Sequence, residues 1–195
     1  MAPSVALLVD RPDAGASALA RDIGLPHAMR LQRLCIQRTL SAAEEIGATP
    51  VVWFRPPDAR AAMRQWIGGA VELRPQASGS LGTRLAATVA GAVLPAGWIV
   101  VPRISASIDA DVLRQALVLL EDTPYVIGPA SDGGIYLMCG RAPVFTALRA
   151  LDSAGPGALE AMRAGLRDGY HHWGESVVLP PFEAARDARA ARLLS

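Results

Sequence analysis

The sequence predicts an α/β protein with a mainly parallel sheet and helices on both of its faces. Short runs that are apolar at every position alternate with segments whose apolar residues recur at helical spacing. This alternation is typical of a parallel sheet that is buried on both sides, giving three layers. With 195 residues, of which 51% are hydrophobic and 19% charged, the chain suits one folded domain. No linker, repeat or low-complexity stretch divides it, so we expect a single domain over residues 1–195.

Strands and helices alternate along the first half of the chain. Residues 5–9 predict the first buried strand, and a loop rich in Asp, Gly and Pro follows it over 10–24. Apolar residues at helical spacing predict a helix over 27–46, which Gly47 ends. The further elements expected here are a strand at 49–54, a helix at 59–67 with Asp58 as its cap and Gly68-Gly69 as its end, a short strand at 71–73 and a helix at 80–94.

The second half continues this alternation. Residues 98–101 predict a third buried strand, and residues 109–120 predict a helix that Asp109 can cap. Two apolar strands, 125–128 and 135–139, lie on either side of a short loop. The remaining expected elements are helices near 143–150 and 157–168, a last strand at 177–179 and a helix over 182–194.

Composition excludes several classes of protein. The net charge is +1 and all 19 basic residues are arginine, so the basic excess of a nucleic-acid-binding protein is absent. Cys35 and Cys139 lack the spacing of a metal site, which indicates buried thiols in a reducing cytoplasm. His171 and His172 are adjacent and point to opposite faces of an extended chain, so we expect no histidine metal site. No run is long enough for a membrane span or a signal peptide, and we expect a cytoplasmic protein.

The most informative stretch is Gly-Pro-Ala-Ser-Asp-Gly-Gly-Ile-Tyr-Leu, residues 128–137. Asp132 comes at the carboxyl end of a predicted strand, where open α/β sheets bind ligands. Gly133 and Gly134 follow it, and a glycine pair lets a ligand approach the main chain closely. Asp-Gly is also the commonest hairpin signal. These residues alone support a ligand site and a plain hairpin turn equally.

Two further loops hold residues suited to phosphate. Arg11 lies in the loop after the first strand, a common phosphate position in doubly wound sheets. Gly79, Gly82 and Arg84 lie around the start of the helix over 80–94, where main-chain N–H groups are free. The alternatives are a solvated Arg11, and a serine-capped helix that carries Arg84 on its surface.

Three stretches carry a resemblance to a known family. The first is Val-Glu-Leu-Arg-Pro-Gln, residues 71–76. Residues 79–85 are similar to the pattern Gly-Asp-Leu-Gly-x-Arg, and residues 128–137 match Gly-Pro-Ala-x-Asp-Gly-Gly-Tyr-Tyr-Leu almost throughout. Both patterns belong to bacterial, uncharacterised GT-A-type glycosyltransferase-like proteins, and the resemblance extends from residue 5 to about 194. It implies a Rossmann-like GT-A fold of the nucleotide-diphospho-sugar transferase superfamily. More distant relatives are nucleotidyltransferases, such as the 2-phospholactate and molybdenum-cofactor guanylyltransferases.

The chain departs from this family mainly in its loops. The family's third-strand loop reads Gly-x-Asp-x-Pro, and its Asp is the expected ligand of Mg²⁺ or Mn²⁺. Ile104 stands there in this chain, beside Arg103, so we assign no metal ligands and leave the cofactor open. Arginine binds phosphate bidentately, which makes a metal-independent route through Arg11, Arg84 or Arg103 feasible. At four other places this chain lacks the residues of the family pattern. Ser80 replaces an Asp, and residues 18–20, with Arg21 nearby, replace a Lys-Thr-Arg run. Residues 152–155 stand where the family has Trp-Ser-Thr, and residues 184–186 stand where it has Asp-x-Asp.

The resemblance implies a nucleotide-sugar-dependent glycosyltransferase-like protein whose catalysis is either retained or lost. A nucleotidyltransferase, or a non-catalytic relative that binds a nucleotide or a partner protein, are the alternatives. In this interpretation Asp132 is the catalytic residue. The helix over 182–194 packs on its own domain or on a second copy, so a homodimer stays open. The residues assigned to the nucleotide are Arg11, Gly79, Gly82, Arg84, Arg103, Gly133 and Gly134.

Overall fold

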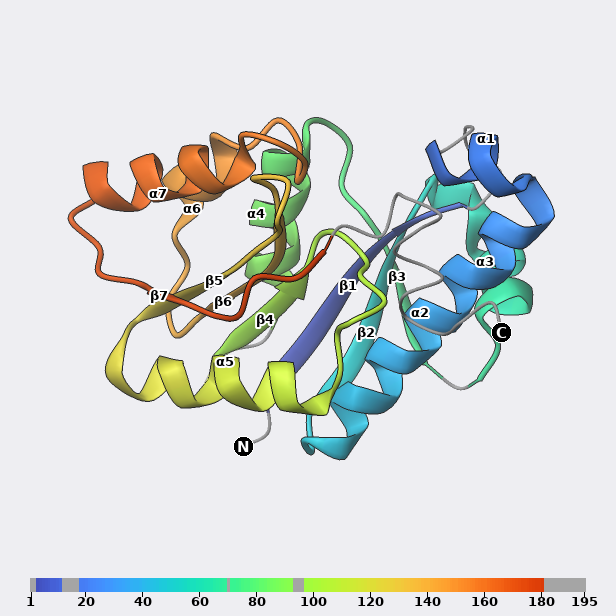
Figure 1. Cartoon of the computed structure of the whole chain (residues 1–195), viewed down its shortest axis with the longest axis horizontal. Helices are drawn as coiled ribbons and strands as arrows, with labels where there is room; N and C mark the ends of the chain where they lie inside the picture. The colour runs from blue at the N-terminus through green and yellow to red at the C-terminus, as the bar shows by residue number, and fades with distance from the viewer. Residues whose placement is uncertain (1–2, 12–17, 70, 93–96, 181–195) are drawn as a thin grey trace.

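A computed structural model describes residues 3–11, 18–69, 71–92 and 97–180, so the predicted helix over 182–194 lies outside the described residues. Its centre is a seven-stranded sheet with the order β3-β2-β1-β4-β6-β5-β7 (Figure 1). Strand β6 pairs antiparallel with β4 and with β5, and every other pairing of named strands is parallel. The mainly parallel sheet is therefore confirmed. The strands are β1 (Ser4–Asp10), β2 (Thr49–Arg55), β3 (Glu72–Pro75), β4 (Trp98–Val101), β5 (Tyr125–Pro129), β6 (Ile135–Gly140) and β7 (Gly174–Glu175).

Helices cover both faces of the sheet. Figure 1 shows α2 and α5 crossing the near face, with α4 on the far side. None of the described helices is both long enough and apolar enough to cross a membrane. The helical elements are α1 (Ala18–Ile23), α2 (Leu25–Glu45), the short 3₁₀ turn η1 (Pro57–Ala59), α3 (Arg60–Ile67), α4 (Leu81–Gly91), α5 (Ala110–Asp122), α6 (Phe145–Arg149) and α7 (Ala158–Asp168).

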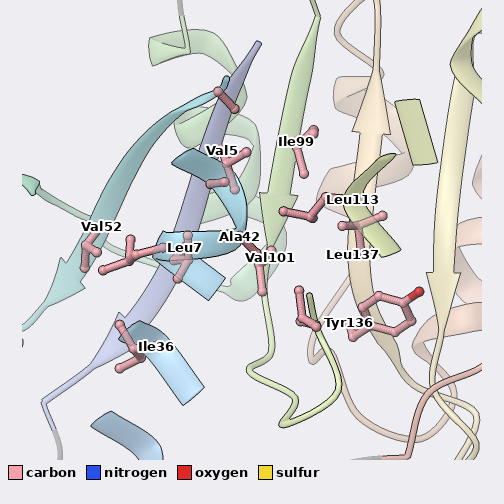
Figure 2. Packing of buried hydrophobic residues seen from close by; sticks show 14 of the residues in the cluster. Val5, Leu7, Ile36, Ala42, Val52, Ile99, Val101, Leu113, Tyr136 and Leu137 are labelled. Atoms are coloured by element: carbon pink, nitrogen blue, oxygen red, sulfur yellow. The ribbon is translucent and has the colours of Figure 1, made fainter. Parts of the chain in front are cut away.

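The two faces carry separate apolar cores. Val5 and Leu7 of β1 pack in one core with Ile36 of α2, as Figure 2 shows. The intervening residues Ala6 and Leu8 belong to the other core, because successive side chains of a strand point to opposite faces. Burial on both faces is the reason that the strand sequences are apolar at every position. The second core takes helical residues from α4, α6 and α7, among them Leu85, Leu148 and Leu166.

The start of α3 differs from the prediction that Asp58 caps it. The 3₁₀ turn η1 precedes α3, and no side chain makes a cap hydrogen bond in either element. Pro56-Pro57 restricts the backbone here, which places Asp58 inside the turn rather than at a cap position. The Asp58 cap is therefore wrong, whereas the predicted end at Gly68 is confirmed by its positive φ of 74°.

The last strand also differs from its prediction. The strand expected at 177–179 is replaced by β7, which pairs with β5 a few residues earlier. The Val177 carbonyl accepts a hydrogen bond from the Tyr136 hydroxyl (2.9 Å) instead of joining a ladder. Leu179 forms only an isolated bridge with Ala130. The apolar residues in this segment predicted a strand, but the side chain of Val177 is exposed because no further strand covers this edge of the described sheet.

Replacing Gly82 in α4 by alanine is expected to lower the free energy of unfolding by about 1–3 kcal/mol, because overpacking a closed contact forces the backbone apart. A Cβ atom there would lie 2.5 Å from the Leu148 carbonyl and 2.7 Å from that of Arg149 in α6. Urea unfolding measures the change. A matched control is Gly155→Ala, whose Cβ would have its nearest neighbour 3.8 Å away. Equal stability of the two variants would contradict the close α4–α6 contact.

Candidate functional site at the carboxyl edge of the sheet

Polar side chains from several strands meet the same edge of the sheet. Asp10 ends β1 and Arg55 ends β2, while Gln76 directly follows β3. Arg103 comes two residues after β4, and Asp132 lies in the loop after β5. Because β1 to β5 all run in one direction, their carboxyl ends share an edge. This is the edge at which open α/β sheets bind ligands.

Asp132 and Arg103 form an ion pair at this edge. The Arg103 Nη1 donates to Asp132 Oδ2 at 2.8 Å, and the two side chains are 11% and 24% exposed. The other carboxylate oxygen, Oδ1, accepts a hydrogen bond from the Gly134 N–H at 3.0 Å. Both oxygens of Asp132 are thus engaged by groups of the chain itself.

The two glycines shape the loop that holds Asp132. Gly133 has a φ of +79° and donates its N–H to the Ala130 carbonyl (3.0 Å), closing a tight turn between β5 and β6. A Cβ atom on Gly134 would lie 2.8 Å from Arg103 Nη1 and 2.5 Å from the Ala154 carbonyl. The loop is therefore a hairpin turn that also presents a carboxylate at the sheet edge. Both glycine N–H groups form hydrogen bonds within the loop.

Gln76 connects the strand edge to α4. Its side chain is buried, and its amide nitrogen donates to the carbonyls of Trp53 (2.8 Å) and Val9 (3.3 Å). Because the nitrogen faces two carbonyls, the amide oxygen must face the other way. There it accepts a hydrogen bond from Arg84 Nη1 at 2.5 Å. Gln76 therefore positions the Arg84 guanidinium against the ends of β1 and β2. Gln76 was not among the predicted site residues.

Arg84 is half-buried, so only the surface position that the alternative gave this arginine is wrong. Its Nε is buried and has no hydrogen-bond partner among the described residues. Burial lowers the pKa of the Arg84 guanidinium, and the charge of Arg55 lowers it further, while Asp10 opposes both. The expected serine cap is confirmed, since Ser80 Oγ accepts the N–H of Thr83 (3.3 Å). A guanidinium with a buried free donor is suited to bind an anion.

A second arginine at this edge is already paired. Arg55 Nε and Nη2 donate to the two oxygens of Asp10, each at 2.5 Å, and this hydrogen bonding raises the pKa of Arg55. The pair forms because Asp10 and Arg55 are direct partners in the parallel register of β1 and β2. Both residues were outside the predicted site, and only a correct strand register could have found them. Arg11 follows β1, and its N–H donates to the Arg55 carbonyl (2.9 Å).

The remaining predicted glycines differ in what they do. Gly79 precedes α4 with a φ of +111°, a conformation that favours glycine, and it is exposed. Gly82 donates its N–H to the Leu151 carbonyl (2.8 Å) and faces α6. The structure therefore gives Gly82 a packing role, and Gly79 stays a candidate for ligand contact.

The described residues at this edge do not provide the ligand set of a divalent metal ion. Mg²⁺ and Mn²⁺ need several oxygen ligands, but the carboxylates of Asp10 and Asp132 are each already paired with an arginine. Ile104, which stands at the expected ligand position, packs against the apolar cores. Within the described part of the chain, no three His, Cys, Asp or Glu residues are grouped so that they could hold a metal.

Comparison with known proteins places the chain in a family. Residues 39–152 match the family described as "Uncharacterized protein conserved in bacteria (DUF2064)". The chain belongs to this family. No curated protein sequence matches it significantly.

Solved structures share the fold of this DUF2064 member. A "putative nucleotide-diphospho-sugar transferase" from Desulfovibrio desulfuricans G20 has a TM-score of 0.70 at 21% identity, over 92% of this chain and 84% of the other. Rv0371c from Mycobacterium tuberculosis H37Rv, in complex with manganese, has a TM-score of 0.53 at 17% identity, over 98% of each chain. A CMP:2-keto-3-deoxy-manno-octonic acid synthetase complexed with CTP has a TM-score of 0.59 at 14% identity, over 100% and 98%. The Rossmann-like fold of the nucleotide-diphospho-sugar transferases is thus confirmed.

Proposed function

We propose that this DUF2064 protein binds a nucleotide or nucleotide sugar at the carboxyl edge of its sheet, as a nucleotide-sugar-dependent glycosyltransferase-like protein. The observation that carries the proposal is the Arg84 guanidinium, which Gln76 holds at this edge while its buried Nε has no partner among the described residues. A donor that is removed from water without a hydrogen bond costs about 1–3 kcal/mol. A ligand anion would recover that energy.

The neighbourhood of Arg84 favours an anion with more than one negative charge. Arg55 lies close enough to lower the pKa of Arg84 by repulsion, and the single carboxylate of Asp10 offsets this only in part. A diphosphate brings negative charge to both guanidinium groups and relieves their repulsion. Gly79 lies exposed just before the first turn of α4, where the N–H groups of Gly82 and Thr83 already have partners within the chain. The charges of Arg84 and Arg55 therefore support a nucleotide diphosphate as the ligand group.

In this proposal the predicted residues have two roles. Arg84 and Gly79 contact the phosphates, and Arg11 lies beside them at the end of β1. Asp132, held by Arg103, faces the reacting end of the ligand and positions the acceptor. We leave out direct ligand contacts from Gly82, Gly133 and Gly134, whose N–H groups bond within the chain. The cytoplasmic location and the homodimer stay predictions.

A screen of nucleotides and nucleotide sugars by thermal shift tests the proposal. A ligand of the folded state raises the melting temperature by mass action, and we expect this for at least one nucleotide or nucleotide sugar. Arg84→Ala should weaken that ligand by at least about tenfold, since a charge-assisted hydrogen bond contributes about 1.5–3 kcal/mol. The control is Arg167→Ala, an exposed arginine on α7. No shift with any ligand, or equal binding by Arg84→Ala, would contradict the proposal.

A nucleotidyltransferase remains the second candidate, because a structural neighbour that spans nearly the whole chain is complexed with CTP. Including nucleoside triphosphates in the screen separates the two. Pyrophosphate release in the presence of a phosphorylated small molecule would favour nucleotidyl transfer, and release of a nucleoside diphosphate from a nucleotide sugar would favour glycosyl transfer. Binding without either product would identify a non-catalytic relative.

A further inference from the structure

We infer that Arg103 supplies, from within the chain, the positive charge that a divalent ion would otherwise bring to Asp132, so that the nucleotide is bound without metal. This inference rests on the proposed nucleotide site. It adds that the site binds the nucleotide without an accompanying divalent metal ion.

The Arg103–Asp132 pair is built into the fold rather than formed by chance on a surface. Arg103 is only 11% exposed, and its Nη1 lies 2.8 Å from Asp132 Oδ2. The second carboxylate oxygen is held by the Gly134 N–H. The guanidinium already balances the negative charge of this carboxylate, which makes it a weaker ligand for an incoming metal ion. An ion that bound Asp132 would also be repelled by Arg103, unless this ion pair were broken.

Gly134 makes this close approach feasible. Any side chain at this position would start 2.8 Å from Arg103 Nη1 and 2.9 Å from Asp132 Oδ1. Glycine therefore leaves room for the guanidinium beside the carboxylate. The residue after Arg103 is Ile104, which is partly buried against two apolar cores. No second carboxylate is thus added next to Asp132 from this loop.

The guanidinium of Arg103 can replace the charge of a metal ion. Arginine stays protonated at every physiological pH and presents several N–H donors in a plane. It can bind Asp132 and still offer positive charge toward a phosphate at the same sheet edge. A metal ion would compete with the guanidinium for the same carboxylate. Nucleotide affinity should therefore be independent of Mg²⁺ and Mn²⁺.

The test measures the affinity of the nucleotide found in the screen, with Mn²⁺ and with excess EDTA, for the wild type and for variants of Arg103. We expect the two wild-type affinities to agree within about twofold. In EDTA, Arg103→Ala should bind the nucleotide at least about tenfold more weakly than the wild type does. The affinity of Arg103→Lys should lie between those of the wild type and Arg103→Ala, because lysine keeps the positive charge. Arg167→Ala is the control. Wild-type affinity that collapses in EDTA, or Arg103→Ala that binds as tightly as the wild type, would overturn the inference.

A second measurement needs neither nucleotide nor Arg103→Ala. The electron paramagnetic resonance signal of free Mn²⁺ is lost when the ion binds a protein, and we expect the wild type to leave it unchanged. Mn²⁺ binding that Asp132→Asn abolishes would show that Asp132 is a metal ligand and would overturn the inference. The proposed function fails separately, if no nucleotide binds under either metal condition.

Discussion

Asp132→Asn is expected to abolish any sugar transfer by this protein, with a loss of at least about a hundredfold in turnover. Asparagine keeps an oxygen for the Gly134 N–H but removes the negative charge that holds Arg103. The side chains at 132 and 103 would then lose their fixed positions at the sheet edge. Misplacing a reacting group by about 1 Å can cost about a hundredfold in rate. The measurement is the rate of sugar transfer from the donor identified in the screen.

Two comparisons make this result specific. Asp168→Asn changes an exposed carboxylate at the end of α7 and should leave turnover unchanged. Circular dichroism and urea unfolding of Asp132→Asn separate a lost function from a lost fold. Full turnover in folded Asp132→Asn would remove Asp132 from the mechanism.

Gln76→Leu is expected to lower both stability and ligand affinity. The substitution leaves the carbonyls of Trp53 and Val9 without their donor and Arg84 without its acceptor. Each buried polar group that loses its partner costs about 1–3 kcal/mol, so the free energy of unfolding should fall by at least about 2 kcal/mol. Because Arg84 is no longer positioned, nucleotide affinity should fall by at least about tenfold. Urea unfolding and a binding titration measure the two effects.

Two further variants separate these effects of Gln76. Gln76→Glu keeps an acceptor for Arg84 but loses both donated hydrogen bonds, so its stability should fall while its affinity stays above that of Gln76→Leu. Gln37→Leu removes one hydrogen bond, which runs from α2 to the Ile67 carbonyl at the end of α3 (3.0 Å). It should cost less stability and leave binding intact. Equal losses of stability and of nucleotide affinity in Gln37→Leu and Gln76→Leu would show that Gln76 does not position Arg84 for binding.

The local features of the chain were largely predictable. The cap at Asp109 is confirmed, with its Oδ1 accepting the N–H of Val112 at 3.1 Å, and Cys35 and Cys139 are buried as expected. Burial raises the pKa of the Cys35 thiol to about 12, which makes it unreactive. Each of these features depends on residues near in sequence or on simple hydrophobicity. The wrong strand at 177–179 arose from the same rule, because a short run of apolar residues predicted a strand there.

The partners of the candidate site residues were not predictable. Arg84 bonds to Gln76 across the junction of a strand and a helix, and Arg103 pairs with Asp132 from another strand. Gly82 was assigned to the nucleotide because it begins a helix, but α6 covers it. No local pattern contains these contacts, since they depend on which elements become neighbours.

The sequence by itself determined the alternation of strands and helices, the two-sided burial of the sheet and the placement of Asp132 after a strand. These follow from the spacing of apolar residues and from turn chemistry, which act over a few positions. The tertiary structure alone decided that Asp132 is paired with Arg103 and that Gln76 holds Arg84. Strand order and register bring these groups within hydrogen-bonding distance, and both are set by the packing of the whole sheet against its helices.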